Sequence, residues 1–155
     1  MTASSVPGPS DSRAAWGELP LLVDTSAWSR AHHAAVRDSW VQALLAGRLR
    51  ISPAARLEIL LSARSGADFD VLAERLTAVR TAPLTTATAR AAQDAMRTLA
   101  HRSAGAQRIP VVDYLIAAAA QETGAAVLHY DRDYDTLAEI MGFESVWLAP
   151  PGSLP

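Results

Sequence analysis

The amino-acid sequence predicts an α/β fold, a three-layer α/β/α sandwich in which helices cover both faces of a central parallel sheet. Short apolar segments that suit strands buried on both faces alternate along the chain with segments of helical periodicity. Strands interleaved with helices in this way favour a parallel sheet. With 155 residues, half of them hydrophobic, the chain is long enough for one domain with its own core.

Four segments have the length and apolar character of strands. They are LPLLVD at 19–24, RLRIS at 48–52, AAVLHY at 125–130 and ESVWLA at 144–149. In parallel sheets, ligands bind beyond the carboxyl ends of the strands. The residues that directly follow these segments are therefore the first candidates for a functional site.

The segments between the strands have helical spacing and recognisable ends. The first covers 25–47 and ends at Gly47, and the second opens with Pro53 and closes at Gly66. Further helices are expected near 68–80, 85–104, 111–124 and 135–142.

We expect one domain at 19–149 between two looser ends. Residues 1–18 are rich in Ser, Pro and Gly, which predicts a flexible extension, and 150–155 predict a short tail. No apolar run reaches the roughly 18 residues that span a membrane, and the N-terminus has no apolar signal-peptide core. These features predict a cytoplasmic protein that does not associate with membranes.

The composition excludes several classes of chemistry. The chain has no cysteine, which removes disulfides, thiol catalysis and zinc–thiolate sites. All fourteen basic residues are arginine, so a Walker A loop and a Schiff-base lysine are excluded within this chain. The net charge of −2 argues against a protein that coats nucleic acid through charge alone. If five of the sixteen acids belonged to a metal site, the fourteen arginines would outnumber the rest, which is compatible with a polyanionic ligand.

Carboxylates follow two of the predicted strands and stand on two predominantly apolar helices. Asp24 ends the first strand and Asp131 follows the third, so both are expected at the same edge of the sheet. Glu58 lies among leucines and Ile59 in the second helix, and Asp113 opens the strongly apolar helix near 111–124. A lone acid within such an apolar segment needs a hydrogen-bond partner or a metal.

Each acid taken singly has a simpler interpretation. Asp113 suits a helix N-cap, Asp24 suits a strand end, and Glu58 suits a solvent-facing helix position. Asp133 suits a turn or the start of a helix, and Asp135 suits a first helical turn, where the helix dipole stabilises it. Taken together, their convergence on one sheet edge favours a divalent cation such as Mg²⁺, which prefers oxygen ligands.

The histidines do not form a convincing alternative metal site. His32 and His33 are adjacent, so their side chains diverge on a helix, and His129 within a strand is expected to be packed. A zinc hydrolase is therefore disfavoured. Carboxylates that hold Mg²⁺ are well suited to activate water for attack on a phosphodiester.

Four segments of the sequence resemble the acidic motifs of PIN-domain nucleases. They are LLVDTSAW, ARLEILLSAR, VVDYLIAAAA and VLHYDRDYDTLA, which contain Asp24, Glu58, Asp113 and Asp131 with Asp133. Each motif alone is weak, but four in this order over about residues 19–149 are specific. The segment HYDRDYD is similar to the corresponding segment of the VapC toxins of type II toxin–antitoxin systems.

The resemblance implies a fold, an activity and partners. It implies a PIN-like α/β/α sandwich and a Mg²⁺- or Mn²⁺-dependent endoribonuclease that cuts RNA. It also implies neutralisation by a VapB-type antitoxin and a homodimer. A nuclease acting on another nucleic acid outside such a system and a catalytically silent PIN-like binding module are the alternatives.

The resemblance also implies roles for individual residues. Asp24 and Asp113 would bind the metal directly, and Asp131 would bind it or one of its waters. Glu58 would orient or deprotonate the attacking water. The auxiliary residues would be Asp133, Thr25 and Ser26.

Surface positions around these acids are candidates for contacts with RNA or the antitoxin. Arg56 and Arg64 flank Glu58 and are the first candidates for such contacts, although solvated surface arginines are an equally good interpretation. The apolar positions of the helices after Thr25 and Pro53 are candidates for an antitoxin groove or for core packing.

Overall fold

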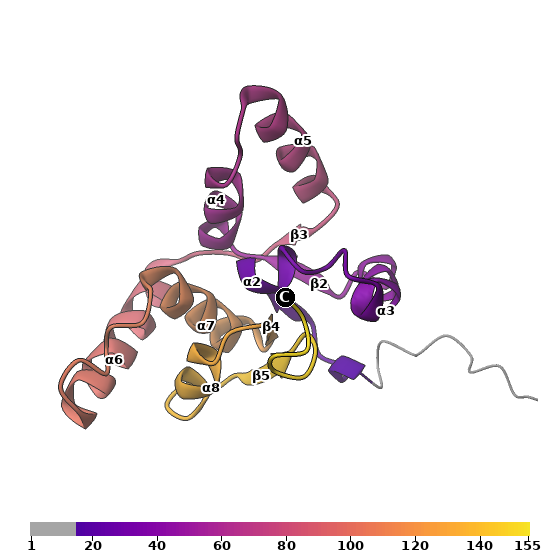
Figure 1. Ribbon diagram of the computed structural model, residues 1–155. Coiled ribbons are helices and arrows are strands. Elements are labelled where there is room, and N and C mark those ends of the chain that lie inside the picture. The colour runs from indigo at the N-terminus through magenta and orange to yellow at the C-terminus, as the bar shows by residue number, and fades with distance from the viewer. Residues whose placement is uncertain (1–14) are drawn as a thin grey trace, which may run out of the picture.

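A computed structural model describes residues 15–155 of the chain, and its centre is a five-stranded sheet (Figure 1). All neighbouring strands pair in parallel, in the order β3-β2-β1-β4-β5. Their bounds are Leu21–Val23 (β1), Leu49–Ile51 (β2), Arg80–Thr81 (β3), Ala126–His129 (β4) and Glu144–Trp147 (β5). This topology confirms the predicted parallel sheet.

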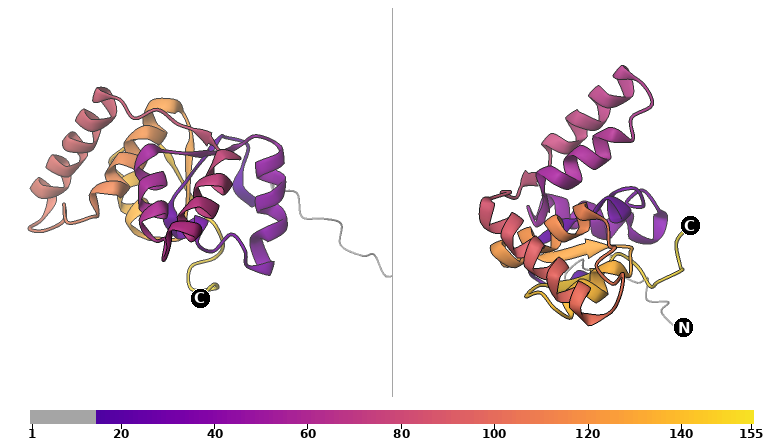
Figure 2. Two further views of the ribbon diagram at one scale, coloured as in Figure 1. Left: turned by 90° about the horizontal axis from the view of Figure 1, so that it is seen from above. Right: turned by 90° about the vertical axis from the view of Figure 1, so that its left-hand side faces the viewer.

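Helices connect the strands and form the outer layers. They are Thr25–Trp28 (α2), Ala34–Leu45 (α3), Pro53–Leu61 (α4), Gly66–Thr77 (α5), Thr86–Arg102 (α6), Val111–Thr123 (α7) and Asp133–Ala138 (α8). Figure 2 shows α3 on one side of the molecule and α6, packed outside α7, on the other. The three-layer α/β/α arrangement is therefore confirmed. None of the described helices is long and apolar enough to cross a lipid bilayer.

The core forms around β1, β4 and α7. Both strands are fully buried, as their uninterrupted apolar sequences predicted. In α7, a run of four buried alanines, Ala117–Ala120, lets the helix backbone lie close to its neighbours. Helices α4 and α5 instead project from the body of the molecule as a pair (Figure 1, Figure 2).

The single helix predicted at 25–47 is wrong in one respect, because the structure has two helices there, α2 and α3, joined by a non-helical segment. The interruption brings Trp28 and Trp40 together, with ring centroids 6.0 Å apart in an edge-to-face contact. Twelve residues of continuous helix would separate them by about 18 Å. The spacing of the apolar residues continues across the break, so periodicity alone did not reveal it.

Two further boundaries differ from the sequence prediction. The exposed two-residue strand β3 was not predicted, because Arg80 and Thr81 form no apolar run. Helix α8 begins at Asp133 rather than Asp135, with the Asp133 backbone N–H bonded to the Asp131 carboxylate. Asp133 therefore belongs to the first turn of this helix.

Both predicted loose ends have defined contacts where the structure describes them. Residues 1–14 of the predicted extension lie outside the described range, but Trp16 is buried and its indole N–H donates to the Leu148 carbonyl (3.2 Å). At the other end, the Leu154 N–H donates to the Tyr130 hydroxyl (2.7 Å), and Arg30 donates to the Pro155 carbonyl (2.9 Å). The division into a domain at 19–149 and two looser ends stays a prediction, and these contacts show how the described ends meet the body of the molecule.

The buried Trp16 packs into the hydrophobic core from a position before the predicted domain start at residue 19. We expect Trp16→Ala to lower the free energy of unfolding by about 3 kcal/mol, because it empties a core position and removes a hydrogen bond. Chemical denaturation measures this change. Leu19→Ala is the control, because Leu19 is exposed, and equal small losses in both variants would contradict the assignment of Trp16 to the core.

Candidate metal centre

The candidate site lies at the carboxyl edge of the sheet, between its two central strands. The Asp24 backbone N–H, directly after β1, donates to the Leu128 carbonyl of β4 (3.0 Å). Because β1 and β4 pair in parallel, Asp24 and Asp131 leave the sheet at the same edge, as predicted. The strand order changes direction here, which is the position where α/β sheets bind ligands.

Asp24 is almost completely buried, and neutral groups hold its carboxylate in place. It caps α2, with Oδ2 accepting from the Ser26 backbone N–H (2.9 Å) and from the Ser26 hydroxyl. The Ser26 hydroxyl oxygen in turn accepts from the Tyr130 backbone N–H (2.9 Å). Ser26 therefore links the end of β1 to the end of β4.

Three further acids converge beside Asp24. One carboxylate oxygen from each of Asp113, Asp131 and Asp133 lies within 4.8 Å of the others. Asp113 comes from the first turn of α7, Asp131 follows β4, and Asp133 begins α8. Three separate elements thus bring their acids to one point, and Asp133 is a full member of the cluster.

Tyr134 joins the two most buried acids. Its hydroxyl lies 2.8 Å from Oδ1 of Asp24 and 3.3 Å from Oδ1 of Asp113, and its side chain is fully buried. Burial and the nearby carboxylates raise its pKa well above the ordinary value, so the hydroxyl keeps its proton and remains a donor. Sequence reasoning missed Tyr134; the signal available was an aromatic residue directly after Asp133.

The electrostatic cost of this arrangement is concentrated on Asp113. Burial, followed by repulsion from Asp24, Asp131 and Asp133, raises its pKa to about 7. Burial and repulsion from Asp131 also raise the pKa of Asp133. The cluster therefore favours the binding of positive charge, either as protons or as a cation.

No basic side chain among residues 15–155 provides that charge. The ion pairs in this range are Arg37–Asp38 and Arg102–Glu139, both of which are exposed and neither of which includes an acid of the cluster. An all-carboxylate donor set fits Mg²⁺ or Mn²⁺, which are hard cations with a preference for oxygen. These residues are consequently suited to hold a divalent cation.

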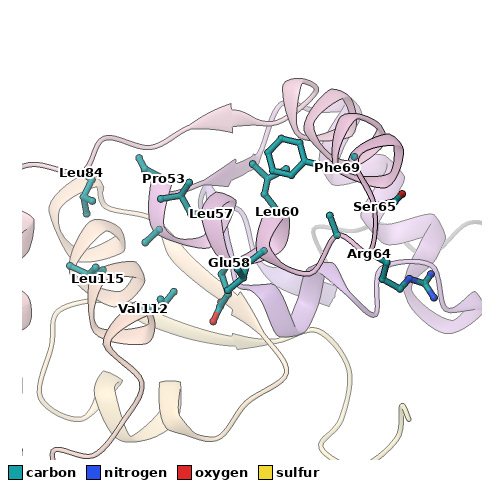
Figure 3. A pocket seen from close by; sticks show the side chains of 14 residues that line it. Pro53, Leu57, Glu58, Leu60, Arg64, Ser65, Phe69, Leu84, Val112 and Leu115 are labelled. Carbon is teal, nitrogen blue, oxygen red and sulfur yellow. The ribbon is translucent and has the colours of Figure 1, made fainter.

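Glu58 lies beside the cluster rather than in it. Its Oε2 accepts a hydrogen bond from the hydroxyl of Thr25, the residue that directly follows Asp24 in the sequence. Glu58 also lines a groove of about 1050 Å³ between α4, α5 and the start of α7. Figure 3 shows its carboxylate pointing away from Leu60 and Phe69.

The two candidate arginines have different surroundings. The Arg56 guanidinium donates to the Leu76 carbonyl (3.2 Å) and the Thr81 hydroxyl (3.3 Å), so it connects α4 to the end of α5 and to β3. These bonds explain Arg56 without a ligand. Arg64 is exposed on the wall of the groove, where its contact with RNA or antitoxin stays a prediction.

Asp135, predicted only to be a favourable charge in the first turn of a helix, also makes hydrogen bonds to β5. Its carboxylate accepts from the Ser145 hydroxyl (2.6 Å) and from the Trp147 indole N–H (3.0 Å). His129, predicted to be packed, is fully buried, and burial lowers its pKa, which favours the neutral ring. Both residues connect the metal-site loop to β5.

The raised pKa of Asp113 makes stability depend on pH. In metal-free protein, we expect the free energy of unfolding to fall as pH rises from about 4 to about 7, because folded Asp113 retains its proton whereas the unfolded side chain loses it near 3.8. Asp113→Asn removes this contribution. After allowance for solvent screening, the variant should gain roughly 2 kcal/mol over the parent protein at pH 8 and little at pH 4.

Urea unfolding in EDTA measures the difference between the two proteins across this range. Asp94→Asn, which changes an exposed acid on α6, is the control for charge removal. Parallel pH profiles for the parent protein and Asp113→Asn would contradict the raised pKa.

Comparison with known proteins identifies relatives of this chain. A sequence model of the PIN domain matches residues 21–140. Ribonuclease VapC18 of Mycobacterium tuberculosis is 41% identical over 137 residues, which cover 88% of this chain and 100% of that protein. Ribonuclease VapC51 of the same organism is 36% identical over 136 residues, with 88% and 98% covered.

Solved structures share the fold at lower sequence identity. DNA-bound VapBC from Salmonella typhimurium matches with a TM-score of 0.69 and 17% identity, covering 85% of this chain and 100% of that chain. VapBC-5 from Mycobacterium tuberculosis matches with a TM-score of 0.61 and 21% identity, covering 83% and 98%. The sequence match over most of the domain, together with the acidic sheet edge, shows that this chain belongs to the PIN-domain family.

Proposed function

We propose that this protein is a divalent-metal-dependent endoribonuclease that acts as the toxin of a toxin–antitoxin pair. One observation carries the proposal: four carboxylates converge at the sheet edge of a PIN domain without a basic partner in the described residues. The similarity to two proteins named as ribonucleases supports RNA as the substrate. A catalytically silent module would have no need to keep this repulsive arrangement.

The acids divide into those that hold the cation and those that act around it. Asp113, Asp131 and Asp133 are the nearest to one another, and Asp24 is joined to Asp113 through the Tyr134 hydroxyl. Mg²⁺ or Mn²⁺ bound by this set would activate water and stabilise the negative charge that develops on the phosphate. Ser26 and Tyr134 would keep the Asp24 carboxylate in a fixed orientation.

We assign Glu58 the role of accepting a proton from the attacking water. Its carboxylate is held by the Thr25 hydroxyl beside Asp24, outside the group of three. In the proposed reaction, water attacks phosphorus, Glu58 accepts its proton, and the P–O bond to the departing ribose oxygen breaks. That oxygen takes up a proton from solvent water as it leaves.

Two apolar grooves supply surfaces for protein partners. The apolar helix positions predicted to meet an antitoxin line two separate grooves, since α4 lines the larger one while α2 and α3 line a smaller one of about 320 Å³. Tryptophan and arginine are frequent anchors of protein interfaces, and the smaller groove contains Trp28, Trp40 and Arg75. We assign a VapB-type antitoxin to this surface, and a cytoplasmic location follows from that partnership.

The larger groove suits a second copy of the chain. Leu57 and Leu61 on α4 are 68% and 85% exposed, and Phe69 on α5 and Leu84 before α6, which also line this groove, are exposed as well. Homodimer interfaces are more apolar than other protein surfaces, and large apolar side chains are otherwise rarely left in water together. We therefore propose a homodimer through this face.

Metal-dependent cleavage is the direct test of the proposed activity. We expect purified protein to cleave RNA with Mg²⁺ or Mn²⁺ and to be inactive in EDTA. Asp24→Asn and Asp131→Asn should each lower the cleavage rate by at least about 100-fold, because each removes a carboxylate from the site. Gel analysis of a mixture of structured RNAs measures the rate.

Asp94→Asn is the matched control, since it removes an exposed acid on α6 and should cleave RNA at the parent rate. Cleavage that survives EDTA, or equal rates in Asp131→Asn and the parent protein, would rule out the proposed mechanism. Preferential cleavage of DNA would instead assign the site to another nucleic acid.

The dimer proposal makes a separate prediction about the exposed leucines. Leu61→Glu should convert a dimer to a monomer, because it places a charge in the centre of an apolar interface. Light scattering combined with size-exclusion chromatography measures the mass. Leu45→Glu is the control, since Leu45 is equally exposed but lies on α3, outside both grooves. Equal masses for the parent protein and Leu61→Glu would exclude this face.

A further inference from the structure

We propose that His129, Ser145 and Asp135 form a hydrogen-bonded chain that positions Asp131 for cation binding. The inference rests on the proposed metal-dependent function and extends it to three residues outside the carboxylate cluster. His129 ends β4, Ser145 lies in β5, and Asp135 lies in α8. None of the three is proposed to contact the cation or RNA.

The first link fixes the backbone of Asp131. The Asp131 N–H donates to Nδ1 of His129 (3.1 Å), which requires that Nδ1 carries no proton. The proton of the neutral ring is then on Nε2, which lies 2.7 Å from the Ser145 hydroxyl oxygen and donates to it. The direction of the first bond thus determines the direction of the second.

The remaining links end on a carboxylate at the surface. The Ser145 hydroxyl accepts from His129 and donates its own proton to Oδ1 of Asp135 (2.6 Å). The Trp147 indole N–H donates to the same carboxylate and holds it in place (3.0 Å to Oδ2). Each hydrogen bond in this network is therefore donated in the same direction, from the Asp131 backbone through His129 and Ser145 to Asp135.

Asp131 needs such support because of its neighbours. It lies in the short connection between β4 and α8 and faces the like charges of Asp113 and Asp133. Its carboxylate has one hydrogen bond within the described residues, from the Asp133 backbone N–H (3.0 Å). Repulsion therefore favours movement of Asp131 away from the cluster, and the bond to buried His129 opposes that movement.

The same histidine supports a second part of the site. Its ring packs against the Tyr134 ring at a centroid distance of 5.0 Å, and the Tyr134 hydroxyl contacts Asp24 and Asp113. The Trp147 ring also packs against the His129 ring, at a centroid distance of 4.9 Å. His129 is consequently held by both its nitrogen atoms and its ring.

The test measures binding of Mn²⁺ to the full chain by calorimetry, without RNA. His129→Leu removes the acceptor for the Asp131 N–H and should weaken Mn²⁺ binding by about 10-fold, the lower end of the effect of residues that orient metal ligands. His129→Asn should bind within about 3-fold of the parent protein, because the amide oxygen of asparagine takes a position similar to that of Nδ1.

Ser145→Ala interrupts the hydrogen-bonded network without altering the buried His129 ring. It should weaken Mn²⁺ binding about 3-fold in the parent protein and have no effect when combined with His129→Asn, whose shorter side chain does not reach Ser145. Thermal unfolding of each variant, measured without metal, separates the loss of stability from the loss of metal affinity.

The outcomes distinguish this inference from the proposed function. Equal weakening by His129→Asn and His129→Leu, or parent-level binding by His129→Leu, would overturn the positioning role while leaving the nuclease intact. An additive effect of Ser145→Ala in the His129→Asn background would also overturn it. If the parent protein itself bound no Mn²⁺, the proposed metal-dependent function would fail first.

Discussion

Repulsion among buried carboxylates is the constraint on which the rest of this structure depends. Asp24 and Asp113 are nearly inaccessible to water, and Asp131 and Asp133 lie beside them. Such a group lowers stability unless a cation or protons compensate for it. The fully buried strands β1 and β4 and the close-packed α7 supply the apolar burial that offsets this cost. The stable core thus permits a site that folding alone would disfavour.

The site is held together by neutral hydrogen-bonding groups rather than by positive charges. The Asp24 carboxylate accepts from the Ser26 and Tyr134 hydroxyls, and Asp131 is held through its backbone by a neutral His129. An arginine in the same place would orient the acids equally well, but it would also neutralise them and compete with a cation. Neutral hydrogen-bonding groups fix the geometry and leave the negative charge available, which is the property that a metal site requires.

Local sequence patterns predicted the sheet and its acids because both depend on residues close together in the chain. Asp24 and Asp131 could be placed at one edge because each follows a short apolar strand. The roles of Tyr134 and Asp135 could not be predicted, because Tyr134 bonds Asp24 across 110 residues and Asp135 bonds residues of β5. The break after Trp28 was hidden for the same reason, since the contact with Trp40 that accompanies it is tertiary. Periodicity reports which residues are buried, but not which partners they meet.

Glu58 connects the chemistry of the site to its largest groove. It stands on the first helix of the projecting α4–α5 pair, with its carboxylate held by Thr25 beside Asp24 and its neighbours lining the groove. A partner that fills this groove therefore lies against the helix that carries the proposed proton acceptor. Since Thr25 begins α2 directly after Asp24, a shift of α4 would alter the bond between Glu58 and Thr25 beside the carboxylate cluster. Occupation of the groove is in this way linked to Glu58 through α4 and to Asp113 through α7, because Val112 and Leu115 of α7 also line the groove.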